Sequence, residues 1–470
     1  MNRRKNVEKL QKGIVEAYKA KDMNRVNQLQ MKLMRSLDGR VTAVLNVRQN
    51  TGGQTPGVDN VTWSEELDKV KAVEWLGEIM NNPKTYKASS LKTVRIPKPG
   101  TEEKRKLRIP TRKDRAAQML YLMATDPVVE CDSDMNSFGF RKDRSTREAV
   151  HLRRMKYASR WGPKFFMETD VAKCFESISH SRLRERTPNR LYVNRLEQWL
   201  KAGNLERGLA PETNETGTPQ GGVVSPMLCN VALNGIERYL AKEGFDRGKG
   251  VHCVRYADDI VVTAKDRTTA ESVKKPRAEF LKERGLMMKE SKTRVGSIED
   301  GFDFLGWNLR RRERDYRYQD SKTSHVFMIM PAKKGIESIQ GKMRKIISDN
   351  SSREKVVKEL NPVIMGWCRY YASSYHSIIS FAKLDHYIYT LMVKWEQNHN
   401  PKRGMKDRRK KTGENWEWSY EDPATKRKKT RYKPTQMKCK YPDFSVLNKW
   451  EQARKTHNPY DPQPGYNKRL

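Results

Sequence analysis

Three aspartates in this 470-residue sequence have surroundings suited to phosphoryl transfer. Asp258 and Asp259 are adjacent in VRYADDIVVTAK, and Asp170 ends the apolar stretch KFFMETD. Two divalent metals about 3.5–4 Å apart can activate a hydroxyl and stabilise a leaving oxygen. Mg²⁺ needs only one or two protein carboxylates besides waters and phosphates, and a metal would offset the repulsion between neighbouring acids. If their strands are neighbours, the three aspartates could form such a site.

Taken alone, the Asp258–Asp259 pair is better explained as a solvated hairpin turn, because Asp is a common turn residue. The surrounding pattern is therefore important. Residues 164–170 are predicted to form a strand ending in a carboxylate, and residues 251–265 a strand, a tight turn and a strand. Residues 217–240 are predicted to form a Gly/Pro-rich turn followed by a helix. This alternation predicts an α+β fold in the middle of the chain.

The flanking regions have different patterns. Residues 7–49 space apolar side chains as amphipathic helices do, and residues 91–118 are predicted to contain a hairpin rich in cations. After Pro331, three successive amphipathic helices are predicted. In the second of these, Asn361 is the expected N-cap and Pro362 belongs to the first turn.

The charge of the chain points to a polyanionic partner. Lys and Arg total 95 against 57 Asp and Glu, a net charge of +38, and cations that neutralise phosphates release condensed counterions. The six cysteines include no CxxC pair, which argues for a reducing compartment and against structural zinc. No apolar run is long enough to span a membrane, and the first residues lack a secretory pattern.

The sequence resembles a known family through an ordered set of motifs. They are RKLRIPTRKDR (105–115), SFGFRKDRST (137–146), FFMETDVAKCFESI (165–178), TPQGGVVSPMLCNVAL (218–233), YADD (256–259), LMMKESKT (286–293) and FDFLGW (302–307). The set is similar to the seven reverse transcriptase blocks of group II intron-encoded proteins. TPGVDN at 55–60 fits the extra upstream block of that family.

The resemblance implies a right-hand polymerase in four parts. These are an N-terminal extension with fingers at 1–163, an α+β palm with a ferredoxin-like sheet at 164–330, a three-helix thumb or maturase domain at 331–401, and a basic DNA-binding region at 402–470. The last part resembles the family only loosely, so a disordered basic tail is the alternative. No endonuclease domain is recognisable.

The resemblance also assigns the metal ligands. Asp170 and Asp258 match the principal Mg²⁺ ligands, Asp259 is the supporting third acid, and the carbonyl of Val171 is a further candidate oxygen. We therefore expect Mg²⁺ as the cofactor.

Five further residues match nucleotide-binding positions of the family. Phe175 matches the sugar gate, an aromatic ring that crowds a ribose 2′-hydroxyl, with core packing as the alternative. Gln220 matches a residue that supports the incoming nucleotide. Lys98 and Arg105 match the cations that grip the triphosphate, although Arg95 and Lys104 are close enough to take these roles. The five residues are Lys98, Arg105, Phe175, Gln220 and Lys292.

Lys292 matches a lysine that could act as general acid towards pyrophosphate, with a plain surface cation as the alternative. Trp367, Tyr370 and Tyr371 fall on an apolar helical stripe and are expected in a core rather than against RNA.

The function implied is an RNA-directed DNA polymerase that binds its group II intron RNA, assists splicing as a maturase and supports mobility by target-primed reverse transcription. The partners expected are intron RNA, target DNA with its primer, and dNTPs. No membrane association is expected, and the sequence does not determine the oligomeric state. The expected location is the bacterial cytoplasm or an organelle that encodes the protein. The alternatives are a related reverse transcriptase recruited to host defence or DNA repair, and a maturase that only supports splicing.

Overall fold

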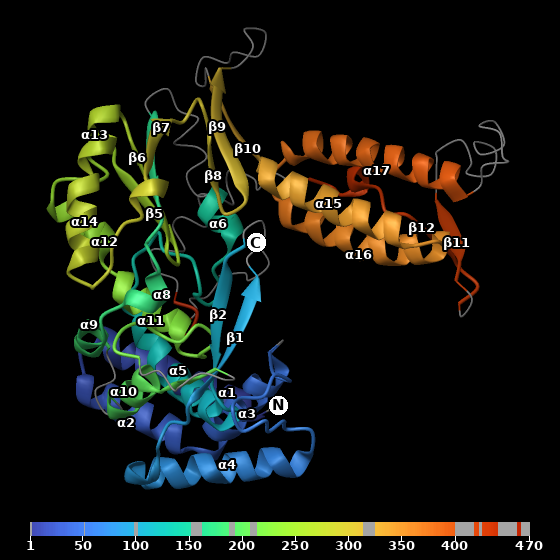
Figure 1. Ribbon diagram of the computed structural model, residues 1–470. Coiled ribbons are helices and arrows are strands. Elements are labelled where there is room, and N and C mark those ends of the chain that lie inside the picture. Colours follow the sequence, from blue (N-terminus) through green and yellow to red (C-terminus); the bar gives the residue numbers. More distant parts are fainter. Residues whose placement is uncertain are drawn as a thin grey trace. The chain divides into compact units, whose positions relative to one another are not determined.

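The computed structural model describes residues 2–50, 52–97, 102–151, 162–187, 193–206, 214–313, 325–399, 418–422, 425–439 and 458–461 (Figure 1). The chain divides into two compact units, each described by itself. Unit 1 comprises residues 1–149, 165–295 and 450–470, and unit 2 comprises residues 150–164 and 296–449. Among the described residues, no helix is both long and apolar enough to cross a bilayer.

Among the described residues, unit 1 contains most of the helices and two sheets. Its helices are α1 (Asn2–Lys19), α2 (Met23–Arg35), α3 (Leu37–Gln49), α4 (Glu66–Asn81), α5 (Arg112–Asp132), α8 (Cys174–Ser177), α9 (His180–Arg186), α10 (Val193–Lys201), α11 (Ser225–Leu233), α12 (Ile236–Lys242), α13 (Arg267–Ser272) and α14 (Lys274–Lys282). Its strands are β1 (Leu91–Pro97), β2 (Lys104–Ile109), β3 (Phe165–Thr169), β4 (Asn204–Leu205), β5 (His252–Tyr256) and β6 (Asp259–Ala264). Two elements, α6 (Thr146–His151) and β7 (Arg294–Ser297), contain two of the four points where the chain passes between the units.

A four-stranded sheet with the order β5-β6-β3-β7 carries the predicted α+β region. Along the chain, β3 is followed by helices, then by β5 and β6, then by α13 and α14, and finally by β7. This is the β-α-β-β-α-β connectivity of ferredoxin-like sheets. The sheet is covered on both faces, because adjacent strand residues such as Phe166 and Met167 are both fully buried, as is Val262 on β6. Figure 1 shows α13 and α14 along one face of this sheet. The strands predicted at 164–170 and 251–265 are present, and the condition that they be neighbours is met, since β3 pairs with β6 from Phe165↔Ala264 to Thr169↔Ile260.

The helices predicted in residues 7–49 are present as α1, α2 and α3. They pack with α5 through buried apolar side chains such as Ile14, Val26 and Leu120. Capping helps to set their bounds: Asp22 and Ser36 accept hydrogen bonds from the first-turn amides of α2 and α3.

The predicted cationic hairpin is formed by β1 and β2, which pair antiparallel from Lys92↔Ile109 to Pro97↔Lys104. The short strand β4 adds to β1 in parallel. The backbone N–H of Arg108 on β2 donates to the carbonyl of Gln220, at 2.7 Å. The hairpin is thereby joined to the loop that carries the TPQGG motif.

Unit 2 combines a small sheet with long helices. The sheet has the order β10-β9-β8 and consists of β8 (Phe302–Phe304), β9 (Trp307–Glu313) and β10 (His325–Pro331). The helices α15 (Lys333–Asp349), α16 (Arg353–Tyr371) and α17 (Ser377–His399) run side by side in Figure 1, and β11 (Ser419–Glu421) pairs with β12 (Lys428–Thr430). The three helices predicted after Pro331 are present.

The predicted start of the second of these helices is wrong. Ser352, not Asn361, caps α16, and Pro362 lies inside the helix. Buried apolar residues such as Val357 and Leu360 on one side of Pro362 and Ile364 on the other continue the stripe, so packing offsets the lost backbone hydrogen bond. The Asn361 side chain instead bonds to the backbone of Thr430 and Tyr432, at 2.9 and 2.7 Å.

The aromatic residues of this helix divide between core and surface. Tyr371 is buried, as expected, and its hydroxyl donates to the carbonyl of Gly306 at 3.0 Å. Tyr370 is 41% exposed, contrary to the expectation of a core position, and its hydroxyl donates to the Leu305 carbonyl at 2.8 Å. Trp367 packs against Tyr371 and Phe381.

The four described residues near the C-terminus, 458–461, contact earlier segments of unit 1. The hydroxyl of Tyr460 donates to Asp126 Oδ2 at 2.5 Å, and the Lys142 ammonium lies 4.4 Å from the centre of the Tyr460 ring. Asp461 accepts a hydrogen bond from Lys19 Nζ at 2.9 Å. Residues from the HNPYDP motif are therefore attached to α1 and α5, and Trp416 of the predicted basic region lies outside the described residues.

Candidate active site

The three predicted aspartates lie at one edge of the four-stranded sheet. Tyr256 pairs with Asp259 at the end of the β5–β6 hairpin, with Ala257 and Asp258 forming the turn. Ala257 has a φ of 56°, the left-handed conformation that lets so tight a turn close. Asp170 follows Thr169, whose partner on β6 is Ile260, next to Asp259. The sheet register thus brings together acids that are far apart in the sequence.

Burial and the crowding of these acids raise the pKa of two of them. Burial raises the pKa of Asp258, and the negative charge of Asp170 raises it further. Burial, followed by the charges of Asp258 and Asp170, raises the pKa of Asp259 to about 6. Much of the Asp259 residue is accessible to solvent, so its shift reflects the packing around its carboxyl group together with the neighbouring acids. Such a cluster favours a cation.

Lys292 supplies one positive charge to the cluster. Its ammonium is hydrogen-bonded and ion-paired with Asp170 Oδ2, and this contact raises the pKa of Lys292. The backbone of Asp170 is fixed as well, because its carbonyl accepts from Lys289 N at 2.9 Å. Val171 is buried and forms a β-bridge with Met288. The LMMKESKT segment therefore holds the strand end that carries Asp170.

The donor chemistry fits a hard divalent cation. Asp170, Asp258 and Asp259 offer only oxygen atoms, which Mg²⁺ prefers. The raised pKa values of Asp258 and Asp259 reflect burial and neighbouring charge that a cation would relieve. Among the described residues, no group of three or more His, Cys, Asp or Glu side chains is arranged to hold an ion. The fit therefore rests on one or two carboxylates acting with phosphate and water oxygens, which is how Mg²⁺ commonly binds.

Arg105, Phe175 and Gln220 are three further predicted nucleotide-binding residues that the structure describes. Arg105 on β2 is near enough for its charge to lower the pKa of Asp258. Phe175 belongs to α8, four residues beyond Val171, and its carbonyl accepts from Thr218 N at 2.6 Å. Gln220 follows in the same loop and bonds to β2 through its carbonyl. Lys98 lies outside the described residues.

Two buried arginines support the backbone that carries the aspartates, and sequence reasoning missed both. Arg277 on α14 is fully buried and donates to the carbonyls of Thr169 and Ile260, at 3.1 and 3.5 Å. Arg255 on β5 donates to Asn230 Oδ1 at 2.9 Å and to the Ala257 carbonyl at 3.2 Å.

The sequence contains a signal for Arg277 only. It lies at the i+4 position of a helical stripe with Val273, Phe280 and Leu281, where a cation is out of place unless it has buried partners. For Arg255 the strand pattern gives no indication of the Asn230 contact, which joins distant parts of the chain.

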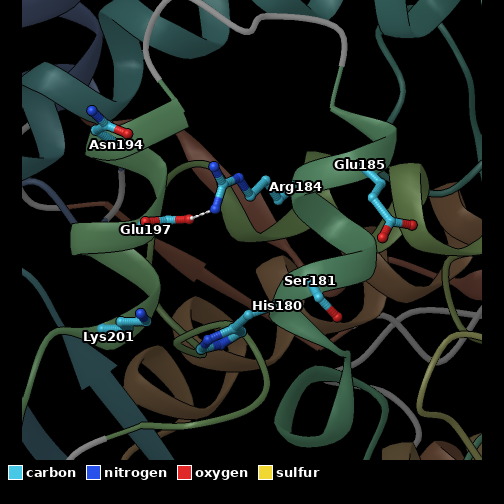
Figure 2. A pocket seen from close by; sticks show the side chains of 7 residues that line it. All are labelled: His180, Ser181, Arg184, Glu185, Asn194, Glu197 and Lys201. Atoms are coloured by element: carbon cyan, nitrogen blue, oxygen red, sulfur yellow. Dashed lines mark hydrogen bonds and ion pairs between the residues drawn. The ribbon is translucent and has the colours of Figure 1, made fainter.

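A separate polar cavity of about 720 Å³ lies in unit 1, between α9 and α10. Figure 2 shows its lining side chains, with Arg184 Nη1 bonded to Glu197 Oε1 across it at 2.8 Å. His180 Nε2 is 2.7 Å from the Gly217 carbonyl. None of the predicted site residues lines this cavity.

Comparison with protein-family models identifies three regions of the chain. Residues 96–309 match the model of reverse transcriptase (RNA-dependent DNA polymerase), and residues 1–76 match the N-terminal domain of reverse transcriptase. Residues 336–414 match the maturase-specific domain of group II introns. The three aspartates, Arg105, Phe175, Gln220 and Lys292 all fall within the first match.

Similar proteins occur in bacteria and in yeast. Protein YkfC of Escherichia coli is 29% identical over 56% of this chain and 78% of its own length. The group II intron-encoded protein LtrA of Lactococcus lactis is 23% identical over 80% of this chain and 76% of its own. The putative COX1/OXI3 intron 1 protein of Saccharomyces cerevisiae is 25% identical over 59% of this chain, and the chain spans only 39% of that protein.

Among solved structures, the telomerase of Candida albicans aligns with a TM-score of 0.39 and 12% identity, over 72% of this chain and 66% of its own. The apo telomerase of Candida tropicalis has the same TM-score at 13% identity, over 47% of this chain and 53% of its own.

Proposed function

Since the chain belongs to the reverse transcriptase and maturase family of group II intron-encoded proteins, we propose that Asp170, Asp258 and Asp259 form its polymerisation centre. The chain is an RNA-directed DNA polymerase with a maturase function in intron splicing and mobility. The observation that carries the proposal is the meeting of the three acids at the edge of the sheet, next to the β5–β6 turn.

In this proposal the carboxylates of Asp170 and Asp258 hold divalent cations, with Mg²⁺ as the natural choice and Asp259 in support. The Val171 carbonyl is a further candidate ligand. Bound divalent cations would lower the pKa of the primer 3′-hydroxyl and stabilise charge on the leaving pyrophosphate. The protein's own contribution is rigidity: the sheet register, the Ala257 turn and the two buried arginines fix the acids before substrate binds.

Lys292 is proposed as the general acid. Its ammonium is held at Asp170, and its raised pKa keeps it charged, so a proton is available beside the carboxylates. A proton transferred from Lys292 Nζ to a pyrophosphate oxygen would improve the leaving group. The lysine could equally serve only to balance the charge of Asp170, and a pH–rate profile of Lys292→Gln would separate these roles, because a general acid gives an alkaline limb that the variant lacks.

The incoming dNTP is proposed to bind between the β1–β2 hairpin and the Gln220 loop. Arg105 and Lys98 are proposed to contact the triphosphate, since charged donors on both sides of a phosphate group orient it. Gln220 would support the nucleotide from its turn, and Phe175 would exclude a ribose 2′-hydroxyl. The hydrogen bond from the Arg108 amide to the Gln220 carbonyl supports this proposal, because it joins the β1–β2 hairpin to the Gln220 loop.

The larger assignments follow the same family. We propose a right-hand polymerase with an N-terminal extension and fingers in residues 1–163, a palm in 164–330, a thumb and maturase domain in 331–401 and a DNA-binding region in 402–470. Intron RNA, target DNA with its primer and dNTPs are the proposed partners, and the excess of cations supports a nucleic-acid partner. A bacterial or organellar location completes the proposal.

Primer extension on an RNA template tests the catalytic assignment. Asp258→Ala is expected to lower kcat by at least about a thousandfold, because the site loses a carboxylate that no neighbour replaces. Glu271→Ala is the matched control, since Glu271 is an exposed carboxylate on α13 that pairs with Arg267. Equal activity of Asp258→Ala and the control would overturn the assignment. Intron-RNA binding by Asp258→Ala should stay at the parental level, which separates the maturase function from polymerisation.

A further inference from the structure

Phe140 is an unusual residue in both exposure and conformation. Its side chain is 52% exposed, although Phe is a large apolar residue, and its φ is 59°. A bulky residue rarely adopts this left-handed conformation, and such outliers persist only where surrounding contacts fix the backbone. Phe138, two residues earlier, is fully buried. The same loop thus contributes one ring to the core and leaves the other outside it.

The contacts that fix this loop come from the turn that bears Asp258. A Cβ on Gly139 would lie 2.3 Å from Ala257 N, so only glycine allows so close an approach. Asn230 Nδ2 donates to the Gly139 carbonyl at 2.9 Å, and Arg255 Nη1 donates to Asn230 Oδ1 at the same distance. Phe140 therefore has a fixed position relative to the carboxylates.

The exposed ring of Phe140 meets Phe175. The two ring centroids are 6.2 Å apart and the planes make an angle of 77°, an edge-to-face contact of the kind aromatic pairs prefer. Phe175 is otherwise only partly packed against the core, while its backbone is fixed through Thr218. The Phe140 ring is thus a neighbour that restrains the direction of the Phe175 side chain.

We propose that Phe140 is a positioning residue for sugar selection: it holds the Phe175 ring in the orientation that excludes ribonucleoside triphosphates and admits deoxyribonucleoside triphosphates. This inference rests on the proposed role of Phe175 as the sugar gate. Phe175 can exclude a single ribose hydroxyl only if its ring cannot rotate away from the sugar. The Phe140 ring, which restrains that rotation, therefore contributes to specificity as well. The close contact of Gly139 with the turn that bears Asp258 keeps the position of the Phe140 ring constant relative to the carboxylates.

Single-nucleotide incorporation on an RNA template tests the proposal, with kcat and KM measured for each dNTP and its matching rNTP. Phe140→Ala is expected to lower the dNTP-over-rNTP ratio of kcat/KM by roughly threefold to tenfold, the range of an aromatic pair contact. The change should come from improved use of rNTPs. Phe140→Leu, which keeps bulk against Phe175, should restore part of the ratio. Leu67→Ala on α4, another exposed apolar residue, is the matched control and should leave the ratio unchanged.

A second variant separates positioning from simple packing. Phe140→Gly removes the ring but suits a φ of 59°, so its Tm should equal or exceed that of the parent while its ratio falls as in Phe140→Ala. An equal loss of kcat/KM for dNTPs and rNTPs, or an unchanged ratio in both variants, overturns the inference.

Phe175→Ala distinguishes this failure from failure of the gate itself. If Phe175→Ala loses selectivity and the Phe140 variants do not, the sugar-gate role of Phe175 is supported and the positioning role of Phe140 is wrong. If Phe175→Ala keeps full selectivity, the proposed gate role fails, and the inference about Phe140 fails with it.

Discussion

At the scale of single residues, Arg277 is a fully buried cation whose desolvation costs free energy. A fully buried guanidinium needs strong partners, and among the described residues Arg277 donates to the carbonyls of Thr169 and Ile260. Burial lowers the pKa of Arg277 to about 10, so it remains charged at neutral pH, and the charge of Asp170 acts in the opposite direction. The positive charge therefore lies beneath the strand ends that carry the acids, where it offsets their repulsion.

We expect Arg277→Met to reduce kcat for primer extension by about tenfold or more, because small displacements of reacting groups are expensive in rate. Stability should fall by only about 1–3 kcal/mol, since two carbonyls lose a donor while a buried charge is removed. Arg284→Met is the matched control: Arg284 is also buried, but it donates to the carbonyls of Ala232 and Phe280. An equal fall of kcat in both variants would show that general destabilisation is responsible.

At the scale of elements, the approach of the Gln220 loop to β2 depends on a glycine. Gly221 has a φ of 123°, and a Cβ there would lie 2.8 Å from the Arg108 carbonyl. Gly221→Ala should cost about 1–3 kcal/mol of stability and separate the loop from the hairpin. Because the nucleotide is proposed to bind between them, KM for dNTPs should rise more than kcat falls. Gly341→Ala on α15 has open space around its Cβ and serves as the control; a rise in KM there too would contradict the explanation.

The elements also show what the sequence can and cannot predict. The β5–β6 hairpin, the strand before Asp170 and the helices of residues 7–49 follow from local periodicity and turn residues, so they were predictable. The start of α16 was not, because tertiary packing of its stripe outweighs the local signal of Pro362. The contacts of Arg255 with Asn230 and of Phe140 with Phe175 join distant segments, and nothing in the local pattern specifies them.

At the scale of the whole chain, residues 458–461 connect a late segment to the first helix of unit 1. Asp126 accepts a hydrogen bond from the Tyr460 hydroxyl. Burial raises the pKa of Asp126 from 3.8 to about 6. Glu130 raises this pKa further, whereas the Tyr460 hydrogen bond and the charges of Arg141 and Lys142 lower it. Since the folded state binds the proton more tightly than the unfolded state, this carboxyl reduces stability as pH rises from about 4 to 6.

Asp126→Asn removes that titration and keeps an oxygen that can accept from Tyr460. Its Tm should exceed that of the parent at pH 7.5, corresponding to about 1–3 kcal/mol, and the difference should shrink at pH 4.5. Tyr460→Phe is the companion variant: it removes the hydrogen bond, so amide exchange in residues 458–461 should accelerate by roughly threefold to tenfold. Exchange at the parental rate in Tyr460→Phe would show that the Tyr460–Asp126 contact does not anchor this segment. An Asp126→Asn advantage independent of pH would show that the raised pKa of Asp126 is not its source.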